Sequence, residues 1–339
     1  SAGQNPMNAQ TILSQYRSGR VDFTQHQLNQ INLRHQDLIG IIFKEAQLFE
    51  ANFMLAFLNR ANFLGANLSK AFFQGANLSQ ANLSGANLQR ADLHGAILTG
   101  ANLTAANLGL ATLTDANLMN ADLRGSNLDR AFLRGACLRG ANLREERKGQ
   151  SQKITSLRGA DLRYTDLLGA NMSGVDLSQA NLQGANLTEA NLRKANLSQA
   201  NLEDAKLNNT ILSDANLQGV NARKSIWKGA KLQRADFTGS CLDYANLSQA
   251  NLSEAKLKKA SLIQANLDKS RLNKADLGRA NLSEASLMEA LLIEAYLGRT
   301  NLTEARLCNA VFTNAELSSA ILMDADLKGA TLPDGSVQS

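Results

Sequence analysis

The sequence has few of the residues that build ordinary globular cores and disulfide-rich folds. Aromatic residues make up 5% of its 339 positions, and there are two prolines and three cysteines. The cysteines (Cys137, Cys241 and Cys308) are odd in number and far apart, so they form neither a disulfide framework nor a CxxC metal pair. A core with so few rings must be built from many small and medium side chains, and alanine and leucine supply them.

The chain also lacks the segments that would send it to a membrane. It has no run of about 18 or more apolar residues, and its start lacks the basic and apolar regions of a secretory signal. Met7 resembles a natural start, so we expect residues 1–6 to be a cloning remnant. The frequent N-x-S/T sequons and unpaired cysteines favour a reducing, cytoplasmic location without membrane contact.

Catalytic motifs are missing too. The three histidines (His26, His35 and His94) share no motif, and there is neither a P-loop nor a GxGxxG segment after a strand. Carboxylates are plentiful, but regular spacing places them in rows by construction. We therefore predict that the protein is not an enzyme and has no catalytic residues, cofactor site or metal site.

What the sequence does contain is a five-residue repeat. Residues 21–145 read in fives as VDFTQ, HQLNQ, INLRH and onward to ANLRE, with Leu or Phe always in the middle. A small residue, usually Ala, stands two positions earlier, and Asn or Asp usually stands between them. A second block runs from Thr155 to about Asp334. In it Ala222 and Trp227 occupy neighbouring middle positions, which we interpret as compensation of volume.

A period of five fits neither an α-helix nor a straight strand. On a helix, five residues advance by about 500°, so successive leucines would drift around the whole surface. On a strand, an odd spacing would place them on alternate faces. One apolar interior therefore requires a coil that turns at each repeat. Phe43, Phe53, Phe63 and Phe73 recur every ten residues, which favours twenty residues per turn.

The A-(N/D)-L-x-x repeat resembles the pentapeptide-repeat family, in particular its cyanobacterial members, over about nine-tenths of the chain. This resemblance implies an all-β fold, the right-handed quadrilateral β-helix, in which the Leu and the small residue point inward and the other three face solvent. The alternative, a disordered low-complexity chain, does not explain strictly spaced leucines.

The N-terminal segment, residues 7–19, is predicted to form a short capping α-helix. Asn8 can cap its start, Ile12 and Tyr16 fall on one face, and Gly19 can end it. A solenoid exposes its last layer at each end, and a helix of this kind would cover one of them.

The rest of the chain divides at an interruption of the repeat. We expect a first repeat block at 20–144, a polar insertion at 145–154, a second block at 155–334 that continues the same β-helix, and a tail at 335–339.

The insertion is the first candidate for a binding site. Leu143 and Leu157 are fourteen residues apart, so nine residues exceed one repeat. They can be a tolerated surface bulge, a recognition loop, or a hinge between two rods. The candidate partner-binding residues are Glu145, Glu146, Arg147, Lys148, Gln150, Gln152 and Lys153.

Charge gives a second candidate. The net charge is +5, yet the segment from Arg223 to Lys274 holds eleven Lys/Arg against four acids, and the segment from Glu284 to Asp334 holds eight acids against three bases. In a twenty-residue coil, Lys231 would stack with Arg271 and Arg234 with Lys274, and these four residues define the candidate basic belt. Aromatic residues are not interleaved with these charges, which argues against nucleic-acid binding.

We interpret the chain as a non-enzymatic rod for protein interaction or scaffolding, with a protein partner that the sequence does not identify. The resemblance offers an alternative, a DNA-mimic regulator of a DNA-binding enzyme such as a topoisomerase, but the pI of about 9.1 argues against it. An ice-binding rod would need a flat rank of threonines, which the outward positions lack. The thinly covered C-terminal coils, residues 310–332, are expected to permit a homodimer, and some family members pair by this end.

Overall fold

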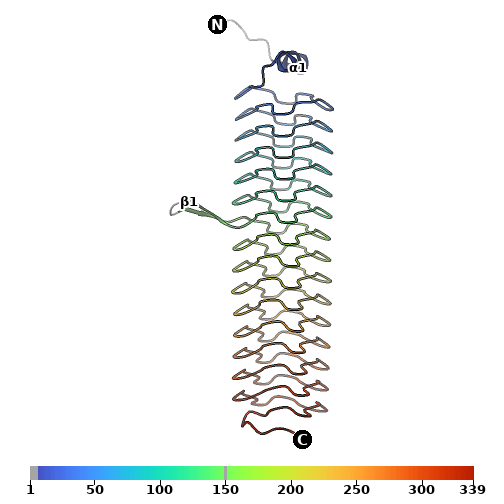
Figure 1. Ribbon diagram of the computed structural model, residues 1–339, viewed down its shortest axis with the longest axis vertical. Helices are drawn as coiled ribbons and strands as arrows, with labels where there is room; N and C mark the ends of the chain where they lie inside the picture. The colour runs from blue at the N-terminus through green and yellow to red at the C-terminus, as the bar shows by residue number, and fades with distance from the viewer. Residues whose placement is uncertain (1–6, 149–150) are drawn as a thin grey trace. The chain divides into compact units, whose positions relative to one another are not determined.

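A computed structural model describes residues 7–148 and 151–339, so the expectation for residues 1–6 and the candidate Gln150 lie outside the described residues. The chain forms two compact units, unit 1 (Ser1–Asn171) and unit 2 (Met172–Ser339). Each unit is a β-solenoid in which parallel bridges join residues twenty positions apart, such as Asn62 with Asn82 and Asn181 with Asn201 (Figure 1). One coil therefore contains four five-residue repeats.

A single repeat satisfies all five of its backbone N–H groups, as residues 76–80 illustrate. One bond closes a turn within the chain, one joins the preceding coil, two join the next coil, and one is made to a side-chain oxygen. The donor and acceptor pairs are Ala76–Phe73, Asn77–Ala56, Leu78–Ile97, Gln80–Thr99 and Ser79–Asn77, at 2.7–3.0 Å. Because buried backbone groups must be paired, this pattern fixes the length of the coil.

The Asn or Asp of the repeat has a backbone role. Its Oδ1 accepts the N–H two residues further on, as between Asn251 and Ser253 at 3.1 Å. Where serine replaces it at position 261, the N–H of Ile263 donates instead to Asp243 of the preceding coil, at 3.0 Å. The acceptor side chain can thus come from the same coil or from the preceding one.

The fifth residue of a repeat lies in the left-handed region, with φ of 60° at Gln249 for example. A β-branched side chain is strained there. Within the described residues, no Val, Ile or Thr has a positive φ, whereas glycine and unbranched polar residues recur at this position. The backbone therefore selects which side chains the solenoid displays at its corners.

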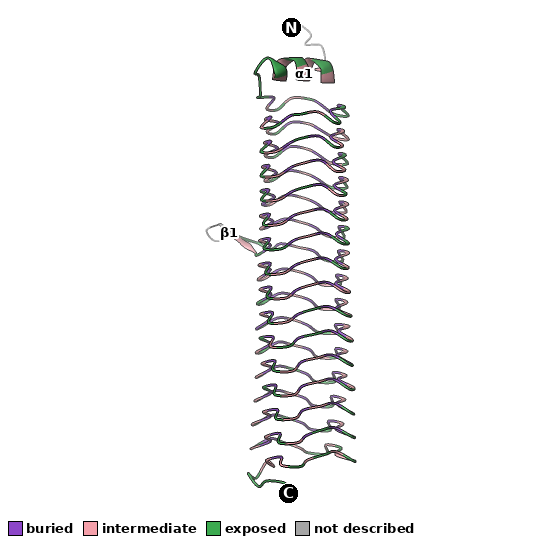
Figure 2. Ribbon diagram, turned by 45° about the vertical axis from the view of Figure 1, so that its right-hand side comes forward, coloured by how far each residue is buried: buried purple, intermediate pink, exposed green. Residues whose placement is uncertain are grey.

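The interior of each unit is filled by the middle residues and the small residues of the repeats. Figure 2 shows buried segments recurring from coil to coil, and the middle leucines are almost all fully buried. The rings of Phe53 and Phe73, twenty residues apart, stack at 5.0 Å. Trp227 and Ala222 are both fully buried, and Trp227 Nε1 donates to Ser225 Oγ at 2.6 Å, so the indole donor is satisfied in the core.

Helix α1 (Ala9–Arg17) precedes the first coil of unit 1. Asn8 is its N-cap and accepts the N–H of Thr11 at 2.9 Å, while the last turn ends at Ser18. Ile12 is fully buried, and the hydroxyl of Tyr16 donates to the carbonyl of Ile39 at 2.8 Å. These contacts tie the helix to the coil that follows it.

The insertion forms a hairpin of two short strands, β1 (Glu146–Lys148) and β2 (Ser151–Lys153), which projects from the coils of unit 1 (Figure 1). The coil resumes directly after it, because Asn127 bridges Ser156 and Asn142 bridges Asn171. Both pairs are twenty-nine residues apart, nine more than elsewhere. The flanking repeats are thus paired within unit 1, an arrangement that a hinge between them would break. Residues 155–171 belong to the same compact unit as the first block.

The hydroxyl group of Thr155 links two coils by hydrogen bonds at the point where the hairpin interrupts them. In an ordinary repeat, the N–H of the fifth residue donates to the carbonyl nineteen positions later, which for Gly125 would be Arg144. Here Gly125 donates to Thr155 Oγ1 at 2.8 Å, and Thr155 Oγ1 donates to the Arg144 carbonyl at 3.1 Å. Thr155 is fully buried, so this relay replaces the bond that the insertion displaces.

Replacing Thr155 tests the relay. Thr155→Val keeps the volume but leaves the buried N–H of Gly125 without an acceptor, which we expect to lower stability by about 1–3 kcal/mol. Thr155→Ser keeps the hydroxyl and should stay close to the parent. Urea-unfolding midpoints of the three chains give the comparison, and equal midpoints for the Val and Ser variants would contradict the relay.

Candidate functional site

The hairpin places its polar side chains close to the coil at its base. Glu146 is paired with Lys153 in the strand register, and Lys153 Nζ donates to the Ala105 carbonyl at 3.4 Å. A Cβ at Gly125 would lie 3.2–3.3 Å from atoms of Glu146 and Lys153, so this glycine leaves them room. The Gln152 amide donates to Glu145. The base of the loop is therefore anchored.

The sequence predicted a polar bulge here, and the strand pairing was missed. Arg147 is opposite Gln152 and Lys148 is opposite Ser151 in the register. Residues 145–153 have no apolar alternation, and Gly149 is the one turn signal within them. The alternation that normally predicts strands depends on one buried face, which a projecting polar hairpin does not have.

The basic belt separates into two columns, each made of residues at twenty-residue intervals. Backbone bridges join Lys231 to Asn251 and Asn251 to Arg271, so Lys231 and Arg271 lie two coils apart. Both cations are exposed. Arg234 and Lys274 lie in the other column. The belt is thus not one continuous positive surface.

The column of Arg234 alternates in sign. At twenty-residue intervals it contains Lys194, Asp214, Arg234, Glu254, Lys274 and Glu294. Arg234 donates from Nε and Nη2 to the two carboxylate oxygens of Asp214 at 2.6 and 3.0 Å, and Lys274 lies 3.6 Å from Glu294. Opposite charges opposed across strands stabilise a sheet. Two of the four belt residues, Arg234 and Lys274, therefore form ion pairs with acidic residues of adjacent coils.

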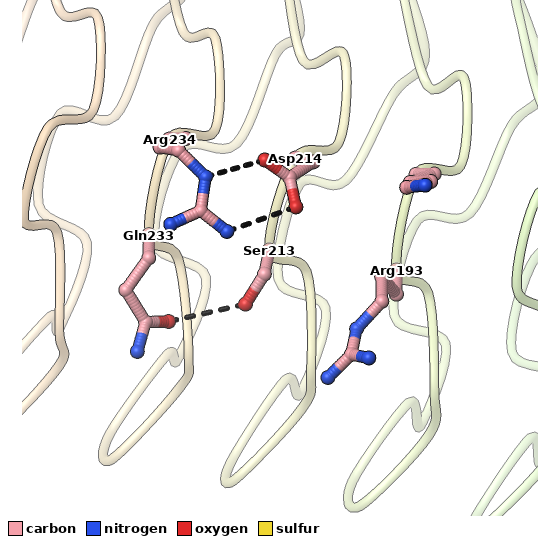
Figure 3. Close-up of a pocket in the computed structure, with 6 residues that line it drawn as sticks. Arg193, Ser213, Asp214, Gln233 and Arg234 are labelled. Atoms are coloured by element: carbon pink, nitrogen blue, oxygen red, sulfur yellow. Dashed lines mark hydrogen bonds and ion pairs between the residues drawn. The ribbon is translucent and has the colours of Figure 1, made fainter.

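A hollow of about 400 Å³ lies along this alternating column. Figure 3 shows the Arg234–Asp214 pair on one side of it and Ser213 donating to Gln233 Oε1, at 3.1 Å, on the other. Arg193 and Lys194 complete the lining. The side chains of the hollow mostly bind one another across adjacent coils.

Ion pairing lowers the pKa of Asp214, because the carboxylate accepts hydrogen bonds from Arg234. The same bonds raise the pKa of the Arg234 guanidinium above its usual value. Since the side chains keep about half and one third of their exposure, water screens the pair. Its contribution to stability is accordingly modest.

Two further columns were missed in the sequence. One contains Lys259, Arg279 and Arg299, and the other Glu284, Glu304 and Asp324, in each case without an opposite charge between them. Counting charges along the chain assigned Lys259 to the basic segment and Arg299 to the acidic one. The signal that could have revealed the basic column is the triplet Leu-Gly-Arg, which occurs at 277–279 and again twenty residues later.

Residues 7–148 and 151–339 contain neither a metal-binding cluster nor a membrane-spanning helix. In these ranges no group of three or more His, Cys, Asp or Glu side chains is placed to hold a metal ion, and the three cysteines are free thiols. The helix among the same residues is too short and polar to cross a bilayer.

The repeat, its parallel coils and its leucine interior define a solenoid of five-residue repeats. A family model described as pentapeptide repeats (8 copies) matches most of the sequence, and the chain belongs to the pentapeptide-repeat family. The matched residues are 27–63, 46–85, 76–115, 106–144, 155–179, 170–209, 210–249, 245–283 and 290–329. A comparison with curated proteins gives no match.

Solved structures similar to this chain include three pentapeptide-repeat or related proteins. HetL of the cyanobacterium Nostoc sp. strain PCC 7120, a pentapeptide repeat protein involved in heterocyst differentiation regulation, is 29% identical, with 98% of this chain and 100% of HetL covered and a TM-score of 0.33. QnrB1, a plasmid-mediated fluoroquinolone resistance protein, is 19% identical over 64% of this chain and 94% of its own, with a TM-score of 0.27. A pentapeptide repeat protein from the Arabidopsis thaliana thylakoid lumen is 32% identical over 35% and 72%, with a TM-score of 0.18.

The Asp214–Arg234 pair gives a prediction for pH. The pKa of Asp214 is lower in the folded chain, so its contribution to stability is present above the unfolded pKa of about 3.9 and is lost as the pH falls through the folded value. We expect Arg234→Gln to lower stability slightly near neutral pH, because water screens the exposed pair, and to have little effect near pH 2. Arg279→Gln, which removes a cation at the same repeat position without an acidic partner, is the control. Urea midpoints at both pH values measure the difference, and an equal loss in the control would contradict the role of the pair.

Proposed function

We propose that the protein is a non-enzymatic scaffold for protein interaction, located in the cytoplasm. The observation that carries this proposal is the surface made by stacked coils: outward residues form columns at intervals of about 4.8 Å, while leucine and alanine fill the interior. Such columns present fixed linear arrays of polar groups to a partner. Solenoids use extended surfaces of this kind for binding.

The proposal includes the finer geometry of the coil. Bridges between residues twenty apart support four sides per turn, and we assign the coils to the right-handed quadrilateral β-helix of the family. Helix α1 serves as the N-terminal cap in this proposal, because Ile12 is buried and Tyr16 binds the first coil.

The hairpin β1–β2 is the proposed partner-binding element. It projects from the coils, carries polar side chains, and is anchored at its base by Thr155 and Lys153. A rigid support with a projecting polar segment is a common arrangement for recognition.

Removing the hairpin tests the function. A chain lacking residues 146–154 restores five-residue spacing between Leu143 and Leu157 and leaves Glu145 at the left-handed position, so we expect it to fold. Deletion of 145–153 would instead place the β-branched Ile154 there and should be less stable, by about 1–2 kcal/mol. Affinity capture from the source organism's lysate, with quantitative mass spectrometry, compares the 146–154 deletion with the intact chain.

A protein captured by the intact chain and lost with the deletion supports the proposal. Arg234→Gln, which alters a column of unit 2, is the control and should retain that protein. Equal capture by the deletion variant would overturn the role of the hairpin, and the lack of any specific protein would overturn the scaffold itself.

The last coil of unit 2 supports a second element of the proposal, a homodimer through the C-terminal coils. The middle residues of the first coil of unit 1, such as Phe23 and Leu38, are fully buried, whereas Leu317, Leu322, Leu327 and Leu332 are partly exposed. Exposed apolar surface at a solenoid end needs a cover, and we propose that a second copy provides it.

The dimer can be tested with two neighbouring lysine substitutions. Leu322→Lys places a charge on the apolar end and should give a monomer, whereas Met323→Lys, at a side chain 62% exposed, should leave the mass unchanged. Sedimentation velocity at micromolar concentration measures both variants and the parent. A monomeric parent would rule out this dimer.

The alternative function, a DNA-mimic regulator of a topoisomerase, is favoured by one observation, the acidic column Glu284, Glu304 and Asp324. The basic column at Lys259, Arg279 and Arg299 lies one repeat earlier in the same coils and opposes it. Capture of a topoisomerase from the lysate, lost on Glu304→Gln, would favour this alternative over the scaffold.

A further inference from the structure

A second hollow in unit 2 has a composition unlike the first. Its volume is about 370 Å³, and its lining contains Lys258, Lys259, Arg279, Arg299, Tyr296 and a single carboxylate, Asp276. Four cations less one carboxylate leave an excess of three positive charges in one small space.

The cations of this hollow are not neutralised by the protein. Lys259, Arg279 and Arg299 occupy adjacent coils, about 4.8 Å apart, where like charges repel. None of the four cations forms an ion pair with an acid of the described residues. The carboxylate of Asp276 accepts the N–H of Gly278 at 2.9 Å and so has a backbone partner. In the alternating column around Arg234, by contrast, charges of opposite sign follow one another from coil to coil. The cluster of like charges in this hollow therefore differs from that pattern.

A tyrosine ring and two glycines also line the hollow. A Cβ at Gly278 would lie 2.8 Å from Cε1 of Tyr296, and one at Gly298 would meet the phenol oxygen. Neither glycine has a positive φ, and their lack of a side chain leaves room for the ring in this position. Tyr296 itself remains 43% exposed, which leaves part of its surface open to solvent.

A backbone donor is also available. In most repeats the N–H at this position binds the Asn or Asp two residues earlier, but at Gly298 that residue is Tyr296. Gly298 is buried, and its N–H has no acceptor among residues 7–148 and 151–339. A backbone N–H without an acceptor in the protein can donate to a ligand that reaches it.

We propose that this hollow binds a linear oligophosphate group, either free or as part of a nucleoside polyphosphate. Phosphates place several negative charges within a few ångströms, and arginine guanidinium groups bind them through paired hydrogen bonds. Backbone N–H groups are further phosphate donors, and the open face of Tyr296 can stack on a base. An acidic peptide strand spreads single charges about 6.6 Å apart along each face, which fits one compact hollow less well. The site goes beyond the scaffold function and does not depend on it.

Titration calorimetry at low ionic strength with tripolyphosphate and with ATP tests the site. Arg279→Gln and Arg299→Gln should each weaken both ligands by about tenfold or more, because each removes charged hydrogen bonds. Tyr296→Leu should weaken ATP by about tenfold and leave tripolyphosphate unchanged if the natural ligand is a nucleotide. If both ligands bind equally and Tyr296→Leu affects neither, the free oligophosphate is the ligand.

Arg234→Gln and Lys274→Gln are matched controls, since they remove cations from the same repeat position in the alternating column. They should bind both ligands like the parent. The melting temperature of each variant shows that it is folded. The proposal is overturned if neither ligand binds at millimolar concentration, if the controls weaken binding as much as Arg279→Gln, or if a polyglutamate peptide binds more tightly than both ligands.

Discussion

The backbone hydrogen bond between successive coils is the interaction on which the rest of the structure depends. Each repeat contributes N–H groups to both neighbouring coils, and the remaining donors are satisfied by a turn and by the Asn or Asp side chain. This pairing sets the coil at twenty residues, and that length places the middle residue of each repeat in register with a middle residue of the next coil. The apolar interior and the outward columns are both consequences of the same donor arrangement.

The length of the coil and the place of the insertion could be predicted from the sequence, because both follow from the spacing of the repeated residues. The ten-residue spacing of Phe53 and Phe63 gave the coil length, and the excess between Leu143 and Leu157 gave the insertion. The pairing of β1 with β2 and the hydroxyl relay of Thr155 could not be predicted. Both depend on contacts between segments that are brought together only by the fold, and neither has a local apolar pattern.

The charged surface was harder to predict than the core for a related reason. Core positions are defined by their place in the repeat, whereas the neighbours of a surface charge are twenty residues away in each direction. From the sequence, Arg234 was assigned to the basic belt, but across coils it binds Asp214. Along the chain Arg299 is one of three bases in the acidic segment, but across coils it is adjacent to Arg279. Both neighbours, Asp214 for Arg234 and Arg279 for Arg299, can be found in the sequence when residues at twenty-residue intervals are compared. The same comparison reveals the basic column that lines the second hollow.

The relay through Thr155 has a consequence for how such proteins can change. Because one hydroxyl spans the gap between Gly125 and Arg144, the coil can leave its path and return without breaking the pairing on either side. The position between Arg144 and Thr155 is therefore a graft point. Foreign segments whose two ends meet as those of the hairpin do could be inserted there, and the solenoid would display them on a support that is already complete.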